Sequence, residues 1–256
     1  MSGGHGRRHL VDLVVHLARR QIDSQHRLTL LGWLWPLARQ LAQLAVLVFL
    51  FSKVLELDIE DYALFVFTGL LIWGWFSSSL TLGTASLTAN RHLVSTPRFP
   101  DVALPLVAVA ATVVDLLLAL PILLIMLALD GRLEASALLF PVVLVALFAF
   151  SAGLAMAASA INVFFRDVAN IVGVALLALF YLTPVFFDLS NVPERFTWVL
   201  EANPMTHFVS AGRDVLFDGR LPDTGTAIAV LAMGPLAALL GFAIFRRLQH
   251  GFVDEL

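Results

Sequence analysis

Six long apolar blocks, separated by charged residues, constrain the fold of this chain more than any other feature. Each block holds roughly the 20 apolar residues that a helix needs to cross the hydrocarbon core of a bilayer. They run approximately over Leu34 to Ser52, Tyr62 to Leu82, Val102 to Leu129, Ala137 to Ile161, Val168 to Phe187 and Thr226 to Phe245. Only 14% of the 256 residues are charged, whereas soluble domains have about a quarter. The sequence therefore predicts an all-α polytopic membrane protein with six transmembrane helices.

Basic residues are distributed unequally between the two sides of these spans. Ten fall on one side: Arg7, Arg8, Arg19, Arg20, Arg27, Arg91, Arg98, Arg166, Arg246 and Arg247. Five, mixed with acidic residues, fall on the other: Lys53, Arg132, Arg195, Arg213 and Arg220. Because cytoplasmic loops carry an excess of Lys and Arg, we expect both termini to be cytoplasmic.

The N-terminal segment has the pattern of an amphipathic helix at the membrane surface. Arg7 to Arg27 interleaves arginines with apolar residues, as such helices do. A secretory signal is the rival interpretation. We disfavour it because Asp12 and His16 interrupt the apolar run and no small-residue cleavage site follows.

The segment Asp188 to Gly225 is long for a loop without structure of its own. Asn191 followed by Pro193 is expected to start one short helix, and Asn203 as N-cap with Pro204 as first residue is expected to start a second. Neither helix is long enough to span a bilayer. They either dip back into the protein as re-entrant helices, which we favour, or cover its outer surface.

Motifs of catalytic and metal sites are missing from the sequence. The single lysine, Lys53, follows no GxxxxG loop, so the chain has no Walker A site and is not a P-loop ATPase. It has no cysteine, its histidines form no HExxH, and no GxSxG elbow occurs. We expect no catalytic residue, no metal, no cofactor and no nucleic-acid partner for this chain.

Two charged residues, Arg39 and Asp115, fall inside predicted spans, where charge is costly and usually functional. Asp115 as a proton relay would indicate an ion-coupled carrier. We favour the alternative that a neighbouring helix or an arginine holds Asp115, because no second acid or histidine lies within a span. Arg39 either reaches the cytoplasmic surface or, with Gln40 and Gln43, lines a polar path.

Aromatic residues gather in the second and fifth spans, as Trp73, Trp75, Phe76, Tyr181, Phe186 and Phe187. One interpretation is an interfacial belt with core packing. The other is a stacking surface for a sugar chain, because the C–H faces of pyranose rings pack on aromatic rings.

Short motifs recur in order along the chain. The first span opens with Leu31-Gly32-Trp33-Leu34-Trp35-Pro36-Leu37, and the loop after the second contains Arg98-Phe99-Pro100. Later come Asn162-Val163-Phe164-Phe165-Arg166-Asp167, Thr183-Pro184-Val185, Asn203-Pro204 and the tail Phe245 to Leu256, FRRLQHGFVDEL. Together, from about Leu28 onward, these motifs resemble the ABC-2 permeases that export bacterial polysaccharides and polyol phosphates. The tail departs from the family pattern at Gln249, where relatives usually have glutamate.

The resemblance implies a permease subunit of the bacterial inner membrane that moves lipid-linked polysaccharide, such as O-antigen, outward. It implies a C2 homodimer with two copies of a cytoplasmic ABC ATPase, which binds ATP and Mg. An ABC-2 exporter of drugs or lipids, and a proton-coupled carrier using Asp115, are the alternatives. The chain would be one transmembrane domain, with an amphipathic helix (1–30), spans one to five (34–187), outer gate helices (188–225), span six (226–245) and a tail (246–256).

The resemblance also implies roles for residues at three places. The candidates for ATPase coupling are Asn90, Arg91, His92, Leu93, Val94, Arg98, Arg166 and Asp167. The basic residues among Asn90 to Arg98 would pair with acids of the ATPase, and Leu93 and Val94 would fill its groove, although Ser95 and Thr96 stand where relatives tend to have lysines. An ordinary basic loop, and a local ion pair between Arg166 and Asp167, are the alternatives. The substrate path would use Arg39, Gln43, Trp73, Trp75, Phe76, Tyr181, Phe186 and Phe187, and the outer gate Trp198, Asn203, Pro204 and Phe208.

Overall fold

Each apolar block forms a helix, because a backbone within a bilayer has to satisfy its own hydrogen bonds. The computed structural model describes residues 34–54, 59–96 and 99–255. The amphipathic helix predicted within residues 1–30 lies outside this range. The described residues form helices and turns without any strand, which confirms the all-α class.

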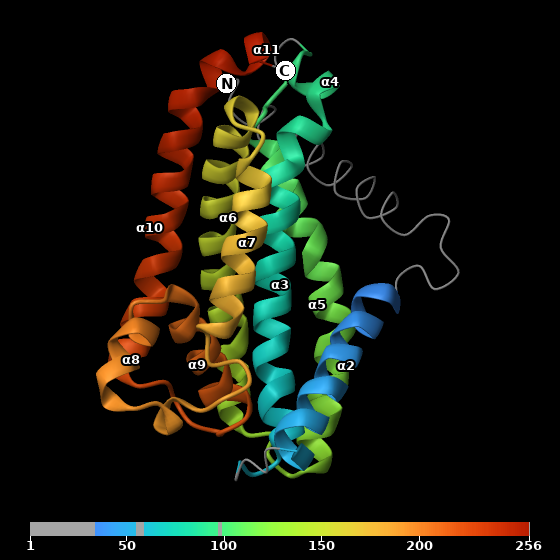
Figure 1. Cartoon of the computed structure of the whole chain (residues 1–256), viewed down its shortest axis with the longest axis vertical. Coiled ribbons are helices and arrows are strands. Elements are labelled where there is room, and N and C mark those ends of the chain that lie inside the picture. The colour runs from blue at the N-terminus through green and yellow to red at the C-terminus, as the bar shows by residue number, and fades with distance from the viewer. Residues whose placement is uncertain (1–33, 55–58, 97–98, 256) are drawn as a thin grey trace, which may run out of the picture.

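In the described part of the chain, six helices form an elongated bundle (Figure 1). They are α2 (Leu34–Val48), continued by a π-helical segment (Phe49–Val54), α3 (Tyr62–Ala89), α5 (Ala103–Leu129), α6 (Phe140–Phe164) after a 3-10 turn (Ala135–Leu139), α7 (Val168–Tyr181) and α10 (Thr224–Leu248). Short helices lie at both ends of the bundle. One end, called the α9 end, carries a 3-10 turn (Leu189–Asn191), α8 (Glu194–Glu201) and α9 (Pro204–Leu216); the other, the α4 end, carries α4 (Arg91–Val94), a 3-10 turn (Gln249–Gly251) and α11 (Phe252–Glu255).

Five of the six helices are long and apolar enough to cross a bilayer, and α7 is the exception. The sequence predicted a span from Val168 to Phe187, but α7 has 14 residues and ends at Tyr181. This boundary was wrong because Pro184 has no N–H group to continue a helix, and Leu182 to Phe187 form a turn. Since 14 residues of α-helix extend about 21 Å and the hydrocarbon core is about 30 Å thick, residues flanking α7 have to complete this crossing.

The helix α3 lies at the centre of the bundle. It contacts α2, α5, α6, α7 and α9, and its side chains are buried around most of its circumference, as Phe67, Ile72 and Phe76 show. The apolar side chains of α2 and α7 are largely exposed. In a membrane, such faces contact lipid or another subunit.

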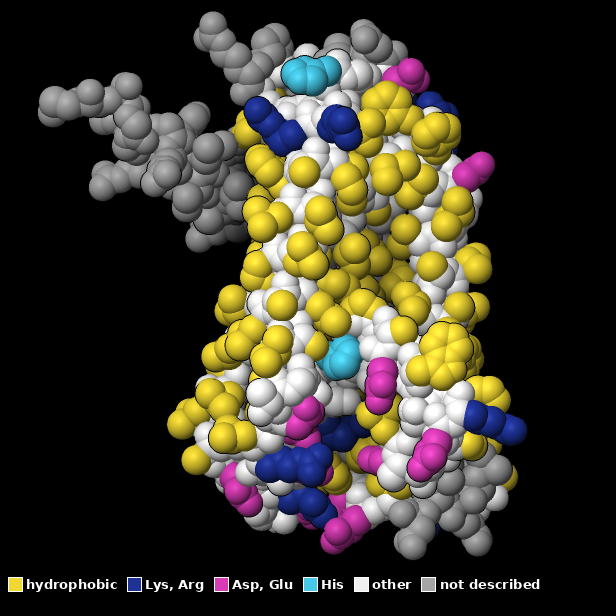
Figure 2. Space-filling view, turned by 90° about the vertical axis from the view of Figure 1, so that its left-hand side faces the viewer, with side chains coloured by type: hydrophobic (Ala, Val, Ile, Leu, Met, Phe, Trp, Pro, Cys, Tyr) yellow, Lys and Arg dark blue, Asp and Glu magenta, His cyan; other side chains and the backbone are white. Residues whose placement is uncertain are grey.

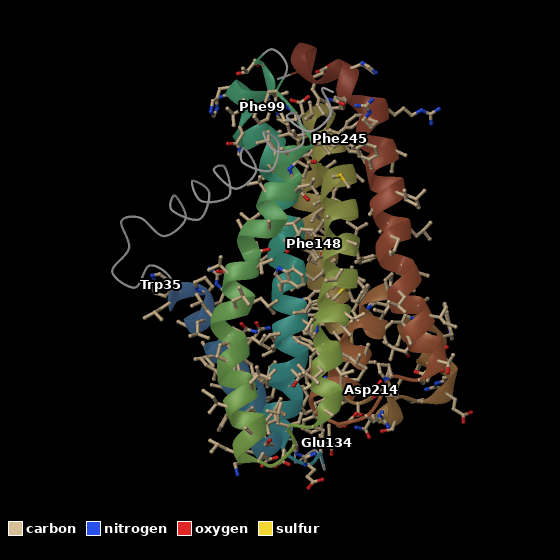
Figure 3. All side chains as sticks on the ribbon, turned by 180° about the vertical axis from the view of Figure 1, so that it is seen from behind. Trp35, Phe99, Glu134, Phe148, Asp214 and Phe245 are labelled. Carbon is tan, nitrogen blue, oxygen red and sulfur yellow. The ribbon has the colours of Figure 1, made fainter. Side chains whose placement is uncertain are left out.

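Charged side chains gather at the two ends of the molecule, and an apolar belt separates them on the face shown in Figure 2. At the α4 end, Arg246 and Arg247 are exposed in the last turn of α10. At the α9 end, Arg132 forms ion pairs with Asp61 and Asp130. This is the surface of a membrane-spanning protein. Figure 3 shows Phe99 and Phe245 at the first end and Glu134 and Asp214 at the second.

Two helices far apart in the sequence, α6 and α10, approach each other at glycines. A Cβ atom added to Gly153 would overlap the backbone of Ala237, and one added to Gly241 would overlap the backbone of Gly153. A Cβ atom on Gly234 would lie 2.6 Å from the carbonyl oxygen of Ala146. Small residues allow transmembrane helices this close contact.

Replacing Gly241 with leucine should therefore separate α10 from α6. Overpacking a tight contact typically costs about 1–3 kcal/mol, and here the obstacle is backbone that cannot rotate away. We expect a lower thermal unfolding midpoint in detergent and less monodisperse protein in size-exclusion chromatography. Ala243→Leu, on the exposed side of the same helix, is the matched control, and equal midpoints for the two variants would contradict the packing.

Candidate functional site

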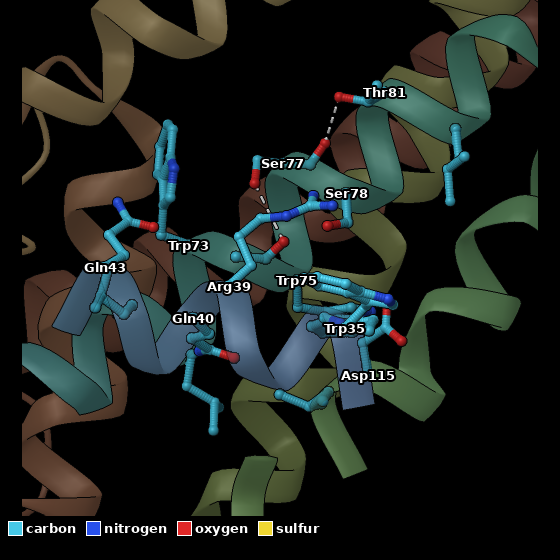
Figure 4. A pocket seen from close by; sticks show the side chains of 16 residues that line it. Trp35, Arg39, Gln40, Gln43, Trp73, Trp75, Ser77, Ser78, Thr81 and Asp115 are labelled. Carbon is cyan, nitrogen blue, oxygen red and sulfur yellow. Dashed lines mark hydrogen bonds between the residues drawn. The ribbon is translucent and has the colours of Figure 1, made fainter. Parts of the chain in front are cut away.

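A pocket of about 500 Å³, lined by polar and apolar side chains, opens between α2, α3 and α5 (Figure 4). This volume is within the range of small-molecule sites. Its lining combines two charged side chains with amides, hydroxyls, indoles and aliphatic residues: Trp35, Pro36, Arg39, Gln40, Gln43, Leu70, Leu71, Trp73, Gly74, Trp75, Ser77, Ser78, Thr81, Leu82, Asp115 and Leu116.

Four residues of the predicted substrate path meet in this pocket. Arg39 and Gln43 lie four residues apart, and therefore on one side of α2, while Trp73 and Trp75 belong to α3. A guanidinium, an amide and indole rings can together bind hydroxyl groups and sugar rings. The pocket offers this chemistry beside the middle of α3.

Asp115, on α5, lines the same pocket. Its carboxylate is not left without an interaction in the folded chain. With Arg39 and Asp115 in one cavity, the pocket carries side chains of both signs, so it lacks the one-sided charge that would concentrate ions of a single sign.

The sequence predicted that the aromatic side chains of the second span line the substrate path, but in the structure these side chains are largely buried. Trp75 is 4% exposed, and its indole N–H donates a hydrogen bond to the Thr112 hydroxyl at 3.1 Å. Phe76 is 2% exposed and stacks on Phe150 in the core, so the structure does not place it on the pocket. Trp35 is 52% exposed and lines the pocket. Sequence reasoning noted it only as part of the first motif.

The other predicted aromatic residues, Tyr181, Phe186 and Phe187, lie outside the pocket, in a cluster formed by the end of α7 and the turn that follows it. Phe180 belongs to this cluster, because the centroid of its ring lies 5.6 Å from that of Phe186. Phe180 also packs on Trp73 at 5.7 Å. A series of ring contacts thus connects Trp73 on the pocket with Phe186 at the α9 end.

The two helices of the last loop begin where the sequence predicted. The helix α8 follows Pro193 directly. Asn203 caps α9, accepting a hydrogen bond from the Met205 N–H at 3.0 Å, and Pro204 is its first residue. The predicted gate residues differ in environment, because Phe208 is fully buried whereas Trp198 is 68% exposed. The helix α9 therefore packs inside the end of the bundle, and α8 lies on its surface.

Sequence reasoning missed the importance of Arg213, which it counted only as a basic residue of the outer loop. Its guanidinium is buried, lies 3.5 Å from the centroid of the Phe65 ring and donates a hydrogen bond to the Val185 carbonyl at 3.1 Å. Burial lowers the pKa of Arg213 to about 10, against the opposing effect of nearby carboxylates such as Asp188. Arg213 is thus still a cation at neutral pH. In the sequence, Arg213 lies within the apolar pattern of α9, and this position could have indicated that its side chain is buried.

The α4 end presents the predicted coupling segment. Arg91 and His92 are exposed on α4, where they are accessible to a partner. Asn90 connects α3 to α4, donating a side-chain hydrogen bond to the Ser86 carbonyl at 2.9 Å. Arg98 lies outside the described residues.

The predicted role of Val94 in a partner's groove does not agree with its position. Val94 is 5% exposed and packs with Leu104, Phe245 and Phe252 in a cluster at the α4 end. Leu93 is half-buried against the same cluster. The apolar side of α4 therefore attaches α4 to α5, α10 and α11, which leaves its polar side for a partner.

Asn162 holds the turn between α6 and α7. Its side-chain amide donates to the Thr84 carbonyl at 3.2 Å, and its oxygen accepts from the Ala169 N–H at 3.2 Å. This one side chain connects α3, α6 and α7. Arg166 and Asp167 are both exposed, and these two described residues form no ion pair with each other. The alternative that their ion pair fixes the turn is therefore not supported.

The tail contacts the start of α5 through Gln249, whose side-chain N–H donates to the Asp101 carboxylate at 3.0 Å. Asp101 is 8% exposed, and its second oxygen has no hydrogen-bond partner. Burial raises the pKa of the Asp101 carboxyl, and the Gln249 hydrogen bond opposes that shift. A glutamate in place of Gln249, as in the family pattern, would face this carboxylate.

Asp101→Asn should stabilise the protein more at about pH 8 than at about pH 4. Because the carboxyl pKa is raised in the folded state, Asp101 favours folding most below its unfolded pKa and loses this contribution as pH rises through the folded pKa. Because the asparagine side chain does not ionise, the variant does not lose this stability as pH rises, and its amide oxygen still accepts a hydrogen bond from Gln249. Thermal unfolding midpoints of both proteins across this pH range test the prediction, and a difference that shrinks with rising pH would contradict it.

Comparison with known proteins identifies the family. Residues 12–217 match the ABC-2 type transporter family. The chain is 28% identical over 250 residues to the O-antigen export system permease protein RfbA of Klebsiella pneumoniae, covering 97% of this chain and 96% of the relative. It is 30% identical over 247 residues to RfbA of Myxococcus xanthus, covering 95% of each. It is 23% identical over 241 residues to the polysialic acid transport protein KpsM of Escherichia coli, covering 92% of this chain and 93% of the relative.

These matches extend over the helices that build the pocket, the α4 end and the α9 end. The resemblance inferred from the motifs is confirmed, and with it the all-α polytopic fold. The chain belongs to the ABC-2 type transporter family of membrane permeases.

Proposed function

We propose that this chain is the permease subunit of an ATP-driven exporter, and that it moves lipid-linked polysaccharide, an O-antigen or a related cell-surface glycan, across the bacterial inner membrane. The observation that carries the proposal is the pocket that contains Arg39 and Gln43, with the series of aromatic contacts next to it, inside an ABC-2 fold whose relatives are named for O-antigen export and polysialic acid transport. Hydroxyl-rich chains need polar contacts and flat apolar rings, and both occur along this path.

The proposal places the energy source at the α4 end. A cytoplasmic ABC ATPase, present as two copies with bound ATP and Mg, would contact Arg91, His92 and the half-buried Leu93 of α4, together with Arg98. Arg166 and Asp167 are exposed on the α6–α7 turn and would extend this surface. The excess of basic residues there supports a cytoplasmic location for this end and for both termini.

A homodimer is the proposed assembly, with the whole chain as one transmembrane domain. Closed C2 symmetry is the commonest arrangement of soluble oligomers, and one six-helix bundle is small for enclosing a glycan. The exposed apolar faces of α2 and α7 are the surfaces that a second copy would cover. Spans one, two and five would then line a central path, with α9 and its cap residues Asn203 and Pro204 at the outer gate.

Depletion of the protein in its bacterial host tests the cargo. We expect a lipid-linked glycan to accumulate on the cytoplasmic leaflet, detected by extraction and mass spectrometry, while glycan on the cell surface disappears. Accumulation of a small amphiphile, with surface glycan unchanged, would instead indicate an exporter of drugs or lipids.

Asp115→Asn separates the permease from a proton-coupled carrier. Under the proposal the carboxylate has a structural role, and we expect ATP-dependent export to stay within about threefold of the parent, because asparagine keeps hydrogen-bonding capacity at this position. Transport in proteoliposomes, with and without a proton gradient, is the measurement. Complete loss of transport in Asp115→Asn, together with transport by the parent that requires the proton gradient, would support the carrier.

A further inference from the structure

The turn that follows α7 has backbone carbonyl groups for which the helix itself provides no hydrogen-bond donor. A helix end leaves its last carbonyl groups without partners inside the helix, and within a membrane no water replaces them. Here α7 ends at Tyr181, and Thr183 and Val185 in the following turn are fully buried. The carbonyl groups of this turn therefore need partners from elsewhere in the chain.

Three side chains supply these partners. The Asn203 amide donates to the Leu182 carbonyl at 3.2 Å, the Arg213 guanidinium donates to the Val185 carbonyl at 3.1 Å, and the Tyr62 hydroxyl donates to the Phe186 carbonyl at 2.7 Å. Asn203 and Arg213 lie at opposite ends of α9, whereas Tyr62 begins α3. We call the turn Leu182–Phe187 the α7 turn.

Several features indicate that Arg213 is built into this position. Its guanidinium lies on the face of the Phe65 ring and also donates to the Phe65 carbonyl at 3.4 Å. Gly69 provides the room, because a Cβ atom there would lie 2.9 Å from the Val185 oxygen and 3.1 Å from the Arg213 guanidinium.

The α7 turn carries the aromatic residues at the outer end of the proposed path. Phe186 stacks on Phe51 of the π-helical segment after α2, with centroids 5.3 Å apart, and packs edge-on against Phe187 at 5.2 Å. The position of the turn thus sets the position of these rings. A displacement of the turn would open the aromatic cluster between α2 and α7.

We propose that Arg213 is the positioning residue of the outer gate: with Asn203 it fixes the α7 turn to α9, and thereby fixes the positions of Phe186 and Phe187. The role as a gate rests on the proposed function, whereas the attachment of the turn to α9 does not depend on any cargo. Tyr62 holds the third carbonyl to α3 and limits the turn from the opposite side.

Cysteine labelling tests this proposal, because the chain has no cysteine of its own. The full-length protein with Phe187→Cys is reconstituted into proteoliposomes and exposed to a membrane-impermeant maleimide. We expect slow labelling in the parent, and labelling about tenfold faster with Arg213→Met, because a buried carbonyl without its partner makes local opening easier. Arg213→Lys should restore part of the protection, and Asn203→Ala should accelerate labelling from the other end of α9.

Two controls distinguish positioning from general loss of structure. Arg195→Met removes an exposed arginine that lies over the Phe196 ring, and it should leave the labelling rate unchanged. A cysteine at exposed Trp198 should label rapidly and equally in every background. Parent-like labelling of Phe187→Cys in Arg213→Met, with an unchanged unfolding midpoint, would overturn the proposal.

If Arg213→Met does not yield folded protein, Gly69→Ala tests the same attachment without removing the cation. Its methyl group would push the Val185 carbonyl away from α3, so labelling should again accelerate, and an unchanged rate would overturn the proposal. Because labelling needs no transported molecule, its outcome is independent of the depletion experiment, which tests the cargo.

Discussion

Replacing Arg91 with glutamate should reduce ATP-dependent export at least about 100-fold, because reversing a charge at a complementary contact costs several kcal/mol. Arg91 is exposed on α4, and the apolar side of this helix is fixed to the bundle through Val94. The substitution therefore changes the surface offered to the ATPase without disturbing the cluster beneath it. Export by reconstituted complex and co-purification of the ATPase are the two measurements, and both should be lost together.

The control for Arg91→Glu is Arg195→Glu at the α9 end, where the arginine is likewise exposed. It changes net charge equally, but we expect the ATPase to stay bound and export to continue. Full export and normal ATPase binding by Arg91→Glu would show that α4 is an ordinary basic loop.

Filling the pocket should block export while leaving the ATPase attached. Gly74 lies on the pocket wall, and a Cβ atom there would meet only the Gln40 side chain, at 3.8 Å. Gly74→Phe therefore places a ring in the cavity of about 500 Å³ rather than in the core. If glycan passes this place, we expect export to fall by more than about tenfold, which corresponds to an increase of about 1.4 kcal/mol or more in the activation free energy of transport.

Gly74→Ala is the matched control, because its methyl group has room and leaves most of the pocket open. It should export at nearly the parent rate, and both variants should unfold near the parent temperature. Unchanged export by correctly folded Gly74→Phe would show that the transport path does not pass through this pocket.

Much of the fold could be predicted from local sequence. The apolar blocks correspond to the six helices, and Asn203 with Pro204 marked the start of α9 correctly, because capping and proline geometry act within a few residues. The end of α7 was misplaced because apolar residues continue beyond it, and the turn at Pro184 depends on partners more than 15 residues away in the sequence, such as Asn203 and Arg213.

The candidate site was predictable only in part. Arg39 and Gln43 were found because polar side chains in a predicted span are conspicuous, and their spacing places them on one side of a helix. The exposure of Trp35 and the burial of Val94 depend on how helices pack, which periodicity within one helix does not determine. Asn162 stood out in a motif, but its hydrogen bond to the Thr84 carbonyl joins segments 78 residues apart.

Reconstitution into proteoliposomes, with and without the partner ATPase, tests most directly whether this permease depends on a separate motor. Lipid-linked glycan is supplied on the ATPase side, and its appearance in the opposite compartment is followed after ATP is added. The account predicts ATP-dependent translocation when the ATPase is bound to the α4 end, and none when the chain is present alone. Uphill translocation at full rate by the isolated chain would contradict it.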